Sequence, residues 1–239
     1  MIRTLALDTS TKFLSLACFE DDNVVSELHE DAGISHSEIL VSRISDMLKS
    51  AGWGTRDIAL TALGIGPGSF TGLRIGTALV KGLAMVSDMK IAGVPTLDAI
   101  ACRAPAGSGL VVPVLDAHKG KVYSCVYERR PDGMPLRKTD YLLCEVGELA
   151  GYVNENAVFF GNGLNKYAED ISKIPGAVLE KNVDWYPRAT DVGRIGMELA
   201  RTTTYTPESI DPMYLHPKEC NVLPGKVKAA SSDKTRNRE

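Results

Sequence analysis

The sequence predicts an α/β protein of two lobes, each with the order βββαβα around a mixed sheet. One observation is a repeat: an apolar strand ending in aspartate, a polar turn and a second alternating strand occur at Leu7-Asp8 to Phe19-Glu20. The pattern returns about a hundred residues later at Leu115-Asp116 to Tyr127-Glu128. The other is composition: 239 residues, 44% hydrophobic, 24% charged and 6% aromatic are typical of a globular chain that needs neither disulfide nor metal to fold.

The first lobe is expected over residues 1–103. Apolar and polar residues alternate in three successive segments, which predicts antiparallel strands. The capping-box sequence Ser35-His36-Ser37-Glu38 then opens a helix, which Gly52 ends. The expected strands are 4–8, 13–19, 23–29, 58–65 and 91–94, and a long helix is expected over 71–86.

The second lobe is expected over residues 104–220, after an Ala-Pro-Ala-Gly-Ser-Gly linker at 104–109. The same order of elements is predicted, less distinctly. The expected strands are 110–116, 121–128, 136–140 and 157–160, with helices near 146–154, 165–172 and 191–201. Residues 221–239 are polar without periodicity and are predicted to be a disordered tail, with folding onto RNA or a partner left open.

Charge and cysteine content exclude several classes of protein. The formal net charge is -3, and the tail is basic, so the rest of the chain is more acidic than the total. That balance argues against a protein that holds nucleic acid alone. The five cysteines are odd in number and form no CxxC pair, which predicts reduced thiols. No apolar run has the length of a signal or a membrane span, so we expect a cytoplasmic protein without membrane contact.

Residues 64–76 read Gly-Ile-Gly-Pro-Gly-Ser-Phe-Thr-Gly-Leu-Arg-Ile-Gly and are the most distinctive stretch. A strand enters a glycine-rich turn that enters a helix, an arrangement whose N–H groups can hold an anion. The phosphate-loop pattern fails because no Gly-Lys-Ser/Thr follows. The dinucleotide fingerprint fails at Thr71, and the nucleophile elbow around Ser69 fails because Pro67 and Thr71 stand where glycines are needed.

The helix after this turn is apolar on most sides, with only Arg74 and Lys81 charged between residues 73 and 86. Such a helix must be covered on most sides. Two interpretations stay open at this point: a central core helix, or a helix that also forms a subunit contact.

The two aspartate turns allow alternative interpretations. Asp8-Thr9-Ser10-Thr11 could hold a hydrated metal and a terminal phosphate, or could be a turn capped by its own side chains. In the second half, Asp116-Ala117-His118-Lys119-Gly120 offers His118 and Lys119 to phosphate or RNA, or simply to solvent.

The histidines do not predict a metal site. His36 begins a helix, and a metal pair on one helical face needs a second ligand four residues later, where Leu40 stands. His29 is expected to face outward from a strand, and His216 precedes a proline. Glu38 is interpreted as a capping residue rather than a general base.

Several motifs together resemble one family, the TsaB (YeaZ) proteins of tRNA threonylcarbamoyladenosine formation. These motifs are Leu7-Asp8-Thr9-Ser10, His36-Ser37-Glu38, residues 66–76, Asp116 with Gly120-Lys121-Val122-Tyr123, Gly161-Asn162-Gly163 and Pro212-Met213-Tyr214-Leu215. The resemblance covers about residues 2–216. It implies a two-lobe actin-like ATPase fold with a ribonuclease-H-like core in each lobe. It also implies a non-catalytic paralogue of TsaD, the subunit that transfers the threonylcarbamoyl group to adenosine 37 of tRNA.

The resemblance further implies partners. The chain would dock and activate TsaD through helices 37–50 and 71–86, TsaE would join the complex, and the chain alone would form a homodimer. Contact with tRNA would come only through the complex. The implied partner-binding residues are His36, Leu40, Ile44, Met47, Leu48, Phe70, Leu73, Ile75, Gly76, Leu79, Val80 and Leu83.

No catalytic residue and no metal is expected, and no cofactor is expected on the subunit alone. TsaD holds its metal with a His-x-x-x-His helix, and Leu40 replaces the second histidine here. ATP or ADP at the contact with TsaD stays open. The residues that would bind it are Asp8, Thr9, Ser10, Gly68 and Ser69, although the Asp8 turn lacks glycine.

Two other functions are considered. The fold alone would allow an ATP-dependent kinase-like enzyme, and the family's grouping with glycoproteases would allow a metallopeptidase. A free-standing tRNA-binding module conflicts with the acidic balance of residues 1–220.

Overall fold

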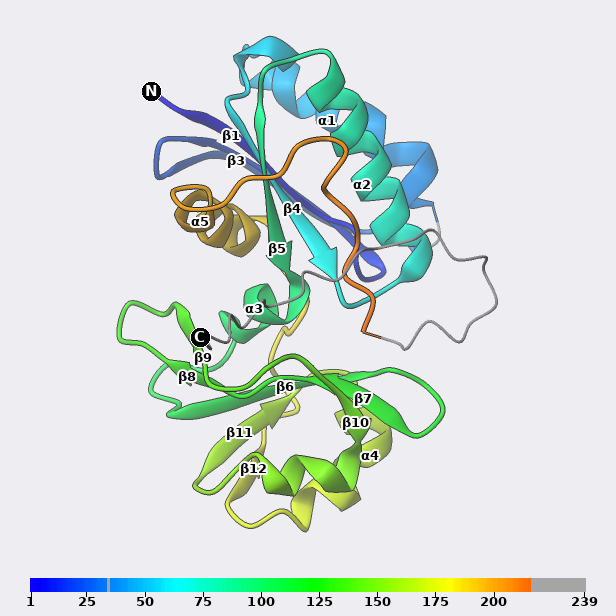
Figure 1. Cartoon of the computed structure of the whole chain (residues 1–239), viewed down its shortest axis with the longest axis vertical. Helices are drawn as coiled ribbons and strands as arrows, with labels where there is room; N and C mark the ends of the chain where they lie inside the picture. The colour runs from blue at the N-terminus through cyan, green and yellow to red at the C-terminus, as the bar shows by residue number, and fades with distance from the viewer. Residues whose placement is uncertain (34, 216–239) are drawn as a thin grey trace, which may run out of the picture.

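The computed structural model describes residues 1–33 and 35–215. Its first lobe is built on one sheet (Figure 1). Its strand order is β3-β2-β1-β4-β5. The first three strands are antiparallel, whereas β4 and β5 run parallel to β1, so the sheet is mixed as predicted. The strands are β1 (Arg3–Asp8), β2 (Phe13–Glu20), β3 (Asn23–Asp31), β4 (Leu60–Gly66) and β5 (Lys90–Pro95).

Helices cover both faces of this sheet. On one face lie α1 (His36–Ser50) and α2 (Phe70–Met85), with the short η1 (Thr55–Asp57) before β4. Their apolar residues and alternate residues of β1, β2 and β4 form one core cluster. The predicted capping box does not form at α1, because the side chain of Ser35 makes no capping hydrogen bond.

The opposite face is covered by α5 (Ala189–Leu199), which corrects the predicted boundary between lobes. This helix was assigned to residues 104–220, yet it packs on β1, β4, β2 and β5. Two of its glycines permit the contact: a Cβ at Gly193 would lie 2.3 Å from the Phe19 ring, and one at Gly196 would lie 2.4 Å from Ala62. The first lobe therefore includes a helix from the end of the chain.

The second lobe repeats the mixed sheet with the order β10-β7-β6-β11-β12. Its strands are β6 (Leu110–Asp116), β7 (Lys121–Ser124), β8 (Tyr127–Arg129), β9 (Pro135–Arg137), β10 (Leu142–Glu145), β11 (Ala157–Phe160) and β12 (Ala177–Leu179). Its helices are η2 (Val146–Gly151), a 3-10 helix, and α4 (Leu164–Ser172).

Two predictions for this lobe are corrected. The single strand expected over 121–128 divides into β7 and β8, because the chain leaves β7 at Cys125 and returns to pair with the start of β6. The third strand of the sheet is β10, not residues 136–140, since β9 pairs only with β8. The helix predicted near 146–154 is the shorter η2.

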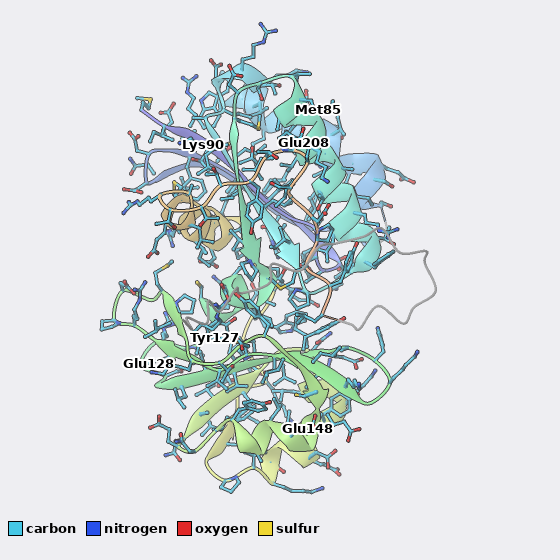
Figure 2. The ribbon with its side chains drawn as sticks, viewed as in Figure 1. Met85, Lys90, Tyr127, Glu128, Glu148 and Glu208 are labelled. Carbon is cyan, nitrogen blue, oxygen red and sulfur yellow. The ribbon has the colours of Figure 1, made fainter. Side chains whose placement is uncertain are left out.

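The short helix α3 (Thr96–Ala101) joins the lobes. Its apolar residues enter a core cluster together with β6, β8 and β11 of the second lobe. Asp98 accepts hydrogen bonds from the hydroxyls of Tyr127, at 2.6 Å, and Tyr141, at 2.9 Å. Figure 2 places Tyr127 at this boundary. The lobes are thus joined by a packed apolar layer with a half-buried, hydrogen-bonded carboxylate.

Two sequence predictions concern the whole chain. Cys18, Cys102, Cys125 and Cys144 carry free thiols, as expected, while Cys220 and the predicted tail lie outside the described residues. Within the described ranges, no helix combines the length and apolarity that a membrane crossing requires.

Candidate functional site

Asp8, the last residue of β1, lies in the interior of the protein together with the turn that follows it. Asp8, Thr9 and Ser10 are all buried. Oδ1 of Asp8 accepts hydrogen bonds from the backbone N–H of Ser10 at 2.9 Å and from its hydroxyl at 2.7 Å, whereas Oδ2 has no hydrogen-bond partner among the described residues. Burial raises the pKa of Asp8 to about 6, although the bonds from Ser10 oppose the shift.

The glycine-rich turn packs directly on this aspartate turn. The N–H of Ser69 donates to the carbonyl of Ser10 at 2.7 Å, and the hydroxyl of Thr9 donates to the carbonyl of Gly72 at 2.8 Å. A Cβ at Gly72 would lie 1.9 Å from the Thr9 carbonyl oxygen, and one at Gly68 would lie 2.4 Å from that of Ser10. The glycines are therefore required for a close approach between two backbone segments.

The residues predicted to bind nucleotide are thus brought together but do not fit a phosphate group. Asp8, Thr9, Ser10, Gly68 and Ser69 meet at the start of α2, where they hydrogen-bond or pack against one another. A phosphate placed there would have to displace the bond between Ser69 and Ser10. Nucleotide binding at these residues stays a prediction that the geometry does not favour.

The corresponding turn of the second lobe is open and charged. Asp116 forms an ion pair with Lys166 from α4 and accepts a hydrogen bond from the N–H of His118 at 3.0 Å. Its own N–H donates to Asn162 at 2.9 Å. Burial opposes ionisation of Asp116, but Lys166 and the His118 N–H outweigh it, so the pKa lies below its usual range.

His118 and Lys119, which were considered for phosphate or RNA, are exposed in this turn. Both adopt the left-handed conformation, with φ values of 63° and 52°. Beyond the approach of the His118 ring to Asp116, these side chains have no contact among residues 1–33 and 35–215 that distinguishes an RNA role from solvation.

Most residues that the resemblance assigned to partner binding lie inside the monomer, which corrects that assignment. The amphipathic pattern of α1 faces its own sheet, so the side chains that looked like a docking face are core residues. The buried ones are His36, Leu40, Ile44, Met47, Leu48, Leu73, Gly76 and Val80. Ile75, Leu79 and Leu83 are half-buried, and Phe70 is exposed.

His36 shows why α1 carries no metal-binding pair. Its Nε2 lies 2.9 Å from the carbonyl oxygen of Thr11, so the ring is bonded to the turn after β1. The residue at the position of a second ligand, Leu40, is 1% exposed and belongs to the core. Across residues 1–33 and 35–215, no three His, Cys, Asp or Glu side chains are grouped so as to hold a metal ion.

The outward surface of α2 remains available for contact. Here the term "α2 outward face" denotes Phe70, Arg74, Ala78, Gly82, Met85 and Val86, which are all exposed. Phe70, Val86 and Met85 are 50%, 63% and 78% exposed, and Val41 of α1 is 61% exposed. Figure 2 places Met85 at the end of α2 farthest from the second lobe. Exposed apolar side chains gathered along one helix are typical of an interaction surface.

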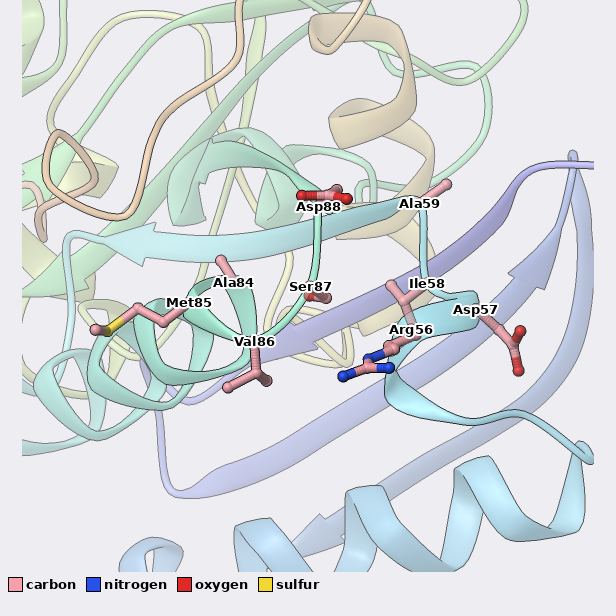
Figure 3. A pocket seen from close by; sticks show the side chains of 9 residues that line it. All are labelled: Arg56, Asp57, Ile58, Ala59, Ala84, Met85, Val86, Ser87 and Asp88. Atoms are coloured by element: carbon pink, nitrogen blue, oxygen red, sulfur yellow. The ribbon is translucent and has the colours of Figure 1, made fainter.

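A groove continues this face at the end of α2. It has a volume of about 680 Å³ and lies between Met85, Val86 and Ser87 on one side and Arg56 and Asp57 of η1 on the other. Figure 3 shows the Met85 and Val86 side chains at its border. The surface beside α2 is thus continued beyond the helix by a groove of mixed apolar and charged lining.

A segment that sequence reasoning did not connect with α2 borders its other side. Residues 205–215, here called the C-terminal strap, run from an isolated bridge between Tyr205 and Ile91 to the first turn of α2 (Figure 1). Tyr214 contacts Phe70, with ring centroids 5.3 Å apart. The motif around Tyr214 was visible in the sequence, but its proximity to α2 depends on the path of the chain after α5.

Comparisons with known proteins agree with this architecture. The TsaD family profile, described as tRNA N6-adenosine threonylcarbamoyltransferase, matches residues 26–184. The chain is 32% identical to the "tRNA threonylcarbamoyladenosine biosynthesis protein TsaB" of Escherichia coli, over 94% of this chain and 100% of that protein. It is 26% identical to the protein of the same name from Bacillus subtilis, over 81% and 86% of the two chains.

A solved structure gives the same result. YeaZ from Pseudomonas aeruginosa superposes with a TM-score of 0.79 at 28% identity, over 90% of this chain and 100% of that one. The predicted α/β fold of two lobes, each with a mixed sheet, is confirmed. Since both the family profile and a full-length relative match, the chain belongs to the TsaB (YeaZ) family, whose members are paralogues of TsaD.

Proposed function

We propose that this protein is a non-catalytic subunit that docks TsaD and activates it for threonylcarbamoyladenosine formation on tRNA. Membership of the TsaB family supports a part in this modification, since the relatives are named as proteins of its biosynthesis. TsaE would join the pair, and tRNA would be bound through the complex.

The observation that carries the docking proposal is the α2 outward face. It exposes Phe70, Met85 and Val86 on one helix, with Val41 on the neighbouring α1. Ala78 and Gly82 between them add no bulk, so another helix could approach the backbone of α2 closely. On the isolated chain the same face would pair with a second copy, and TsaD would compete with that homodimer.

The two aspartates support the non-catalytic part of the proposal. Asp8 is fully buried and Asp116 is paired with Lys166, so neither presents a free carboxylate to the space between the lobes. A general base needs a carboxylate within reach of substrate. The reacting groups would then belong to TsaD.

Reconstitution tests the proposal. TsaD, TsaE and tRNA are combined with the threonylcarbamoyl donor, with and without this protein, and threonylcarbamoyladenosine is measured in the tRNA. We expect product only when the protein is present. Equal formation without it, or no complex with TsaD, would contradict the proposal.

A matched pair of variants locates the docking face. Val86→Glu places a charge on the α2 outward face, and Val178→Glu places the same charge on an exposed valine of the second lobe, 53% exposed. We expect the first to weaken TsaD binding about tenfold or more, and the second to leave it within about twofold. Both should unfold at the temperature of the parent protein, because both valines face solvent.

A further inference from the structure

Phe70, Arg74 and Tyr214, here called the Arg74 cluster, lie where the first turn of α2 meets the C-terminal strap. We propose that this cluster binds a carboxylate side chain of the docked subunit, with the Arg74 guanidinium as the main anchor. The inference rests on the proposed function, because it names the chemistry by which that docking face recognises its partner.

The guanidinium of Arg74 is held in place from two directions. Its central carbon lies 3.7 Å from the centroid of the Phe70 ring, and its Nε donates to the Tyr214 hydroxyl at 3.3 Å. These contacts occupy one face of the guanidinium plane and its Nε–H donor. The two terminal amino groups form no ion pair within the part of the chain that the structure describes. They are the pair of donors that binds a carboxylate in a fork.

Tyr214 is itself anchored by the strap. The N–H of Met213 donates to the carbonyl of Ile65 at 2.7 Å, and Asp211 pairs with Lys81 of α2 at 3.0 Å. Ile210 is fully buried in the core of the first lobe. The strap therefore fixes the ring before any partner arrives, and a pre-positioned arginine loses less conformational freedom on binding.

The surroundings favour a protein carboxylate over RNA phosphate. RNA contact requires several unpaired cations along one surface. On α2 the only other cation, Lys81, is already paired with Asp211. The rest of the α2 outward face is apolar, and Phe70 and Tyr214 are 50% and 48% exposed beside the guanidinium. Arginine and aromatic residues set in an apolar surface are typical of the strongest contacts between proteins.

Charge reversal tests the inference. Arg74→Glu is compared with Arg201→Glu, which makes the same change of charge at an exposed position after α5. Binding of the full chain to TsaD is measured by calorimetry. We expect the dissociation constant to rise about 30-fold or more for Arg74→Glu and to stay within about twofold for Arg201→Glu. Melting temperatures measured alongside should show that both variants fold.

Two conservative variants separate geometry from charge. Arg74→Lys keeps the charge but loses the fork, and we expect binding about tenfold weaker. Tyr214→Phe keeps the ring but removes the hydroxyl that orients Nε, and we expect a loss of about threefold. Binding by Arg74→Lys at the parent affinity would overturn the inference, because a simple charge effect would then suffice.

Rescue identifies the partner group. Acidic residues of TsaD are changed singly to arginine, and one of them should restore binding to Arg74→Glu while weakening the parent. A failure of the parent protein to bind TsaD would overturn the proposed function itself. Normal TsaD binding by Arg74→Glu would overturn only the carboxylate inference. Loss of tRNA affinity in the complex, with TsaD binding intact, would assign the cluster to RNA instead.

Discussion

The turns at Asp8 and Asp116 occupy the same place in the two lobes, yet their electrostatics are opposite. Asp8 is buried with a raised pKa and forms no ion pair with the described residues, whereas Asp116 is paired with Lys166 and has a lowered pKa. Each aspartate turn has a glycine turn packed beside it, but the two are placed differently: residues 68–72 pack on Thr9 and Ser10, whereas Gly161-Asn162-Gly163 pack on Val114 and leave the Asp116 carboxylate in contact with Lys166. Both lobes thus keep the strand and its terminal aspartate, while the two aspartates differ in burial, ion pairing and pKa.

The largest expected effect concerns the packing of the glycine-rich turn against the Asp8 turn. Gly72→Ala places a Cβ 1.9 Å from the Thr9 carbonyl oxygen, so backbone must move, and we expect the free energy of unfolding to fall by about 3 kcal/mol or more. Gly82→Ala, on the same helix with nothing within 4 Å, should instead raise it by about 0.5–1 kcal/mol. Urea unfolding of both variants gives the comparison, and equal stabilities would show that the two turns do not pack as described.

The next effect is a dependence on pH. Asp8 binds its proton more tightly when folded, at a pKa of about 6 against an ordinary value of 3.8, so the folded state loses stability as pH rises between these values. The contribution of this residue falls by about 2 kcal/mol between pH 4 and pH 7. We expect Asp8→Asn to lack this fall in the free energy of unfolding.

Burial also raises the pKa of Asp98 and Asp191, so the parent protein alone would not identify the group responsible. The measurement is therefore the difference between parent and Asp8→Asn at each pH. A difference that stays constant from pH 4 to pH 7 would contradict the assignment to Asp8.

A smaller effect of opposite sign is expected in the second lobe. The ammonium of Lys166 stabilises the charged form of Asp116, so Asp116→Asn should lower stability at neutral pH by about 1 kcal/mol, because the pair lies near the surface. A double-mutant cycle with Lys166→Met isolates the pair. Coupling close to zero would mean that Asp116 is held by the His118 N–H and the Tyr167 hydroxyl rather than by Lys166.

The sequence predicted the first lobe better than the second, for a physical reason. In the first lobe each predicted strand corresponds to one observed strand, and glycine or polar turns mark the strand ends. In the second lobe the pattern of 121–128 continues through Cys125 although the backbone changes partner there, and periodicity does not record which strand is the partner. The prediction that α5 belongs to the second lobe was wrong for a similar reason, because the amphipathic pattern of a helix does not show which sheet it packs against.

The residues of the candidate site were likewise predicted only in part from the sequence. The pattern of Leu40, Ile44 and Leu48 identifies a buried stripe correctly, but it cannot distinguish the core of this chain from that of a partner. The position of Arg74 depends on Tyr214, 140 residues further along the chain, so only the tertiary structure brings them together. Phe70 was predicted because its motif is distinctive, and the structure leaves it exposed.

The smallest expected effect is the change that nucleotide causes in the melting temperature of the isolated chain. This measurement tests both aspartate turns together. A ligand at a concentration equal to its dissociation constant adds only about 0.4 kcal/mol, or about 1 °C in melting temperature for a chain of this size. We expect Mg-ATP at about 1 mM to shift the melting temperature by no more than that, since Asp8 is covered and Asp116 is already paired.

A shift of about 5 °C or more would mean a dissociation constant of about 30 µM or lower and would contradict the description of both turns. Two variants then locate the site: loss of the shift in Asp116→Asn alone would place the phosphates on the second lobe, and loss in Asp8→Asn would mean that the glycine-rich turn opens. A shift that requires TsaD as well would instead place the nucleotide at the contact between the subunits. In that case neither turn would hold it alone, because the first lacks space and Asp116 of the second is already paired with Lys166, and the missing groups would have to come from TsaD.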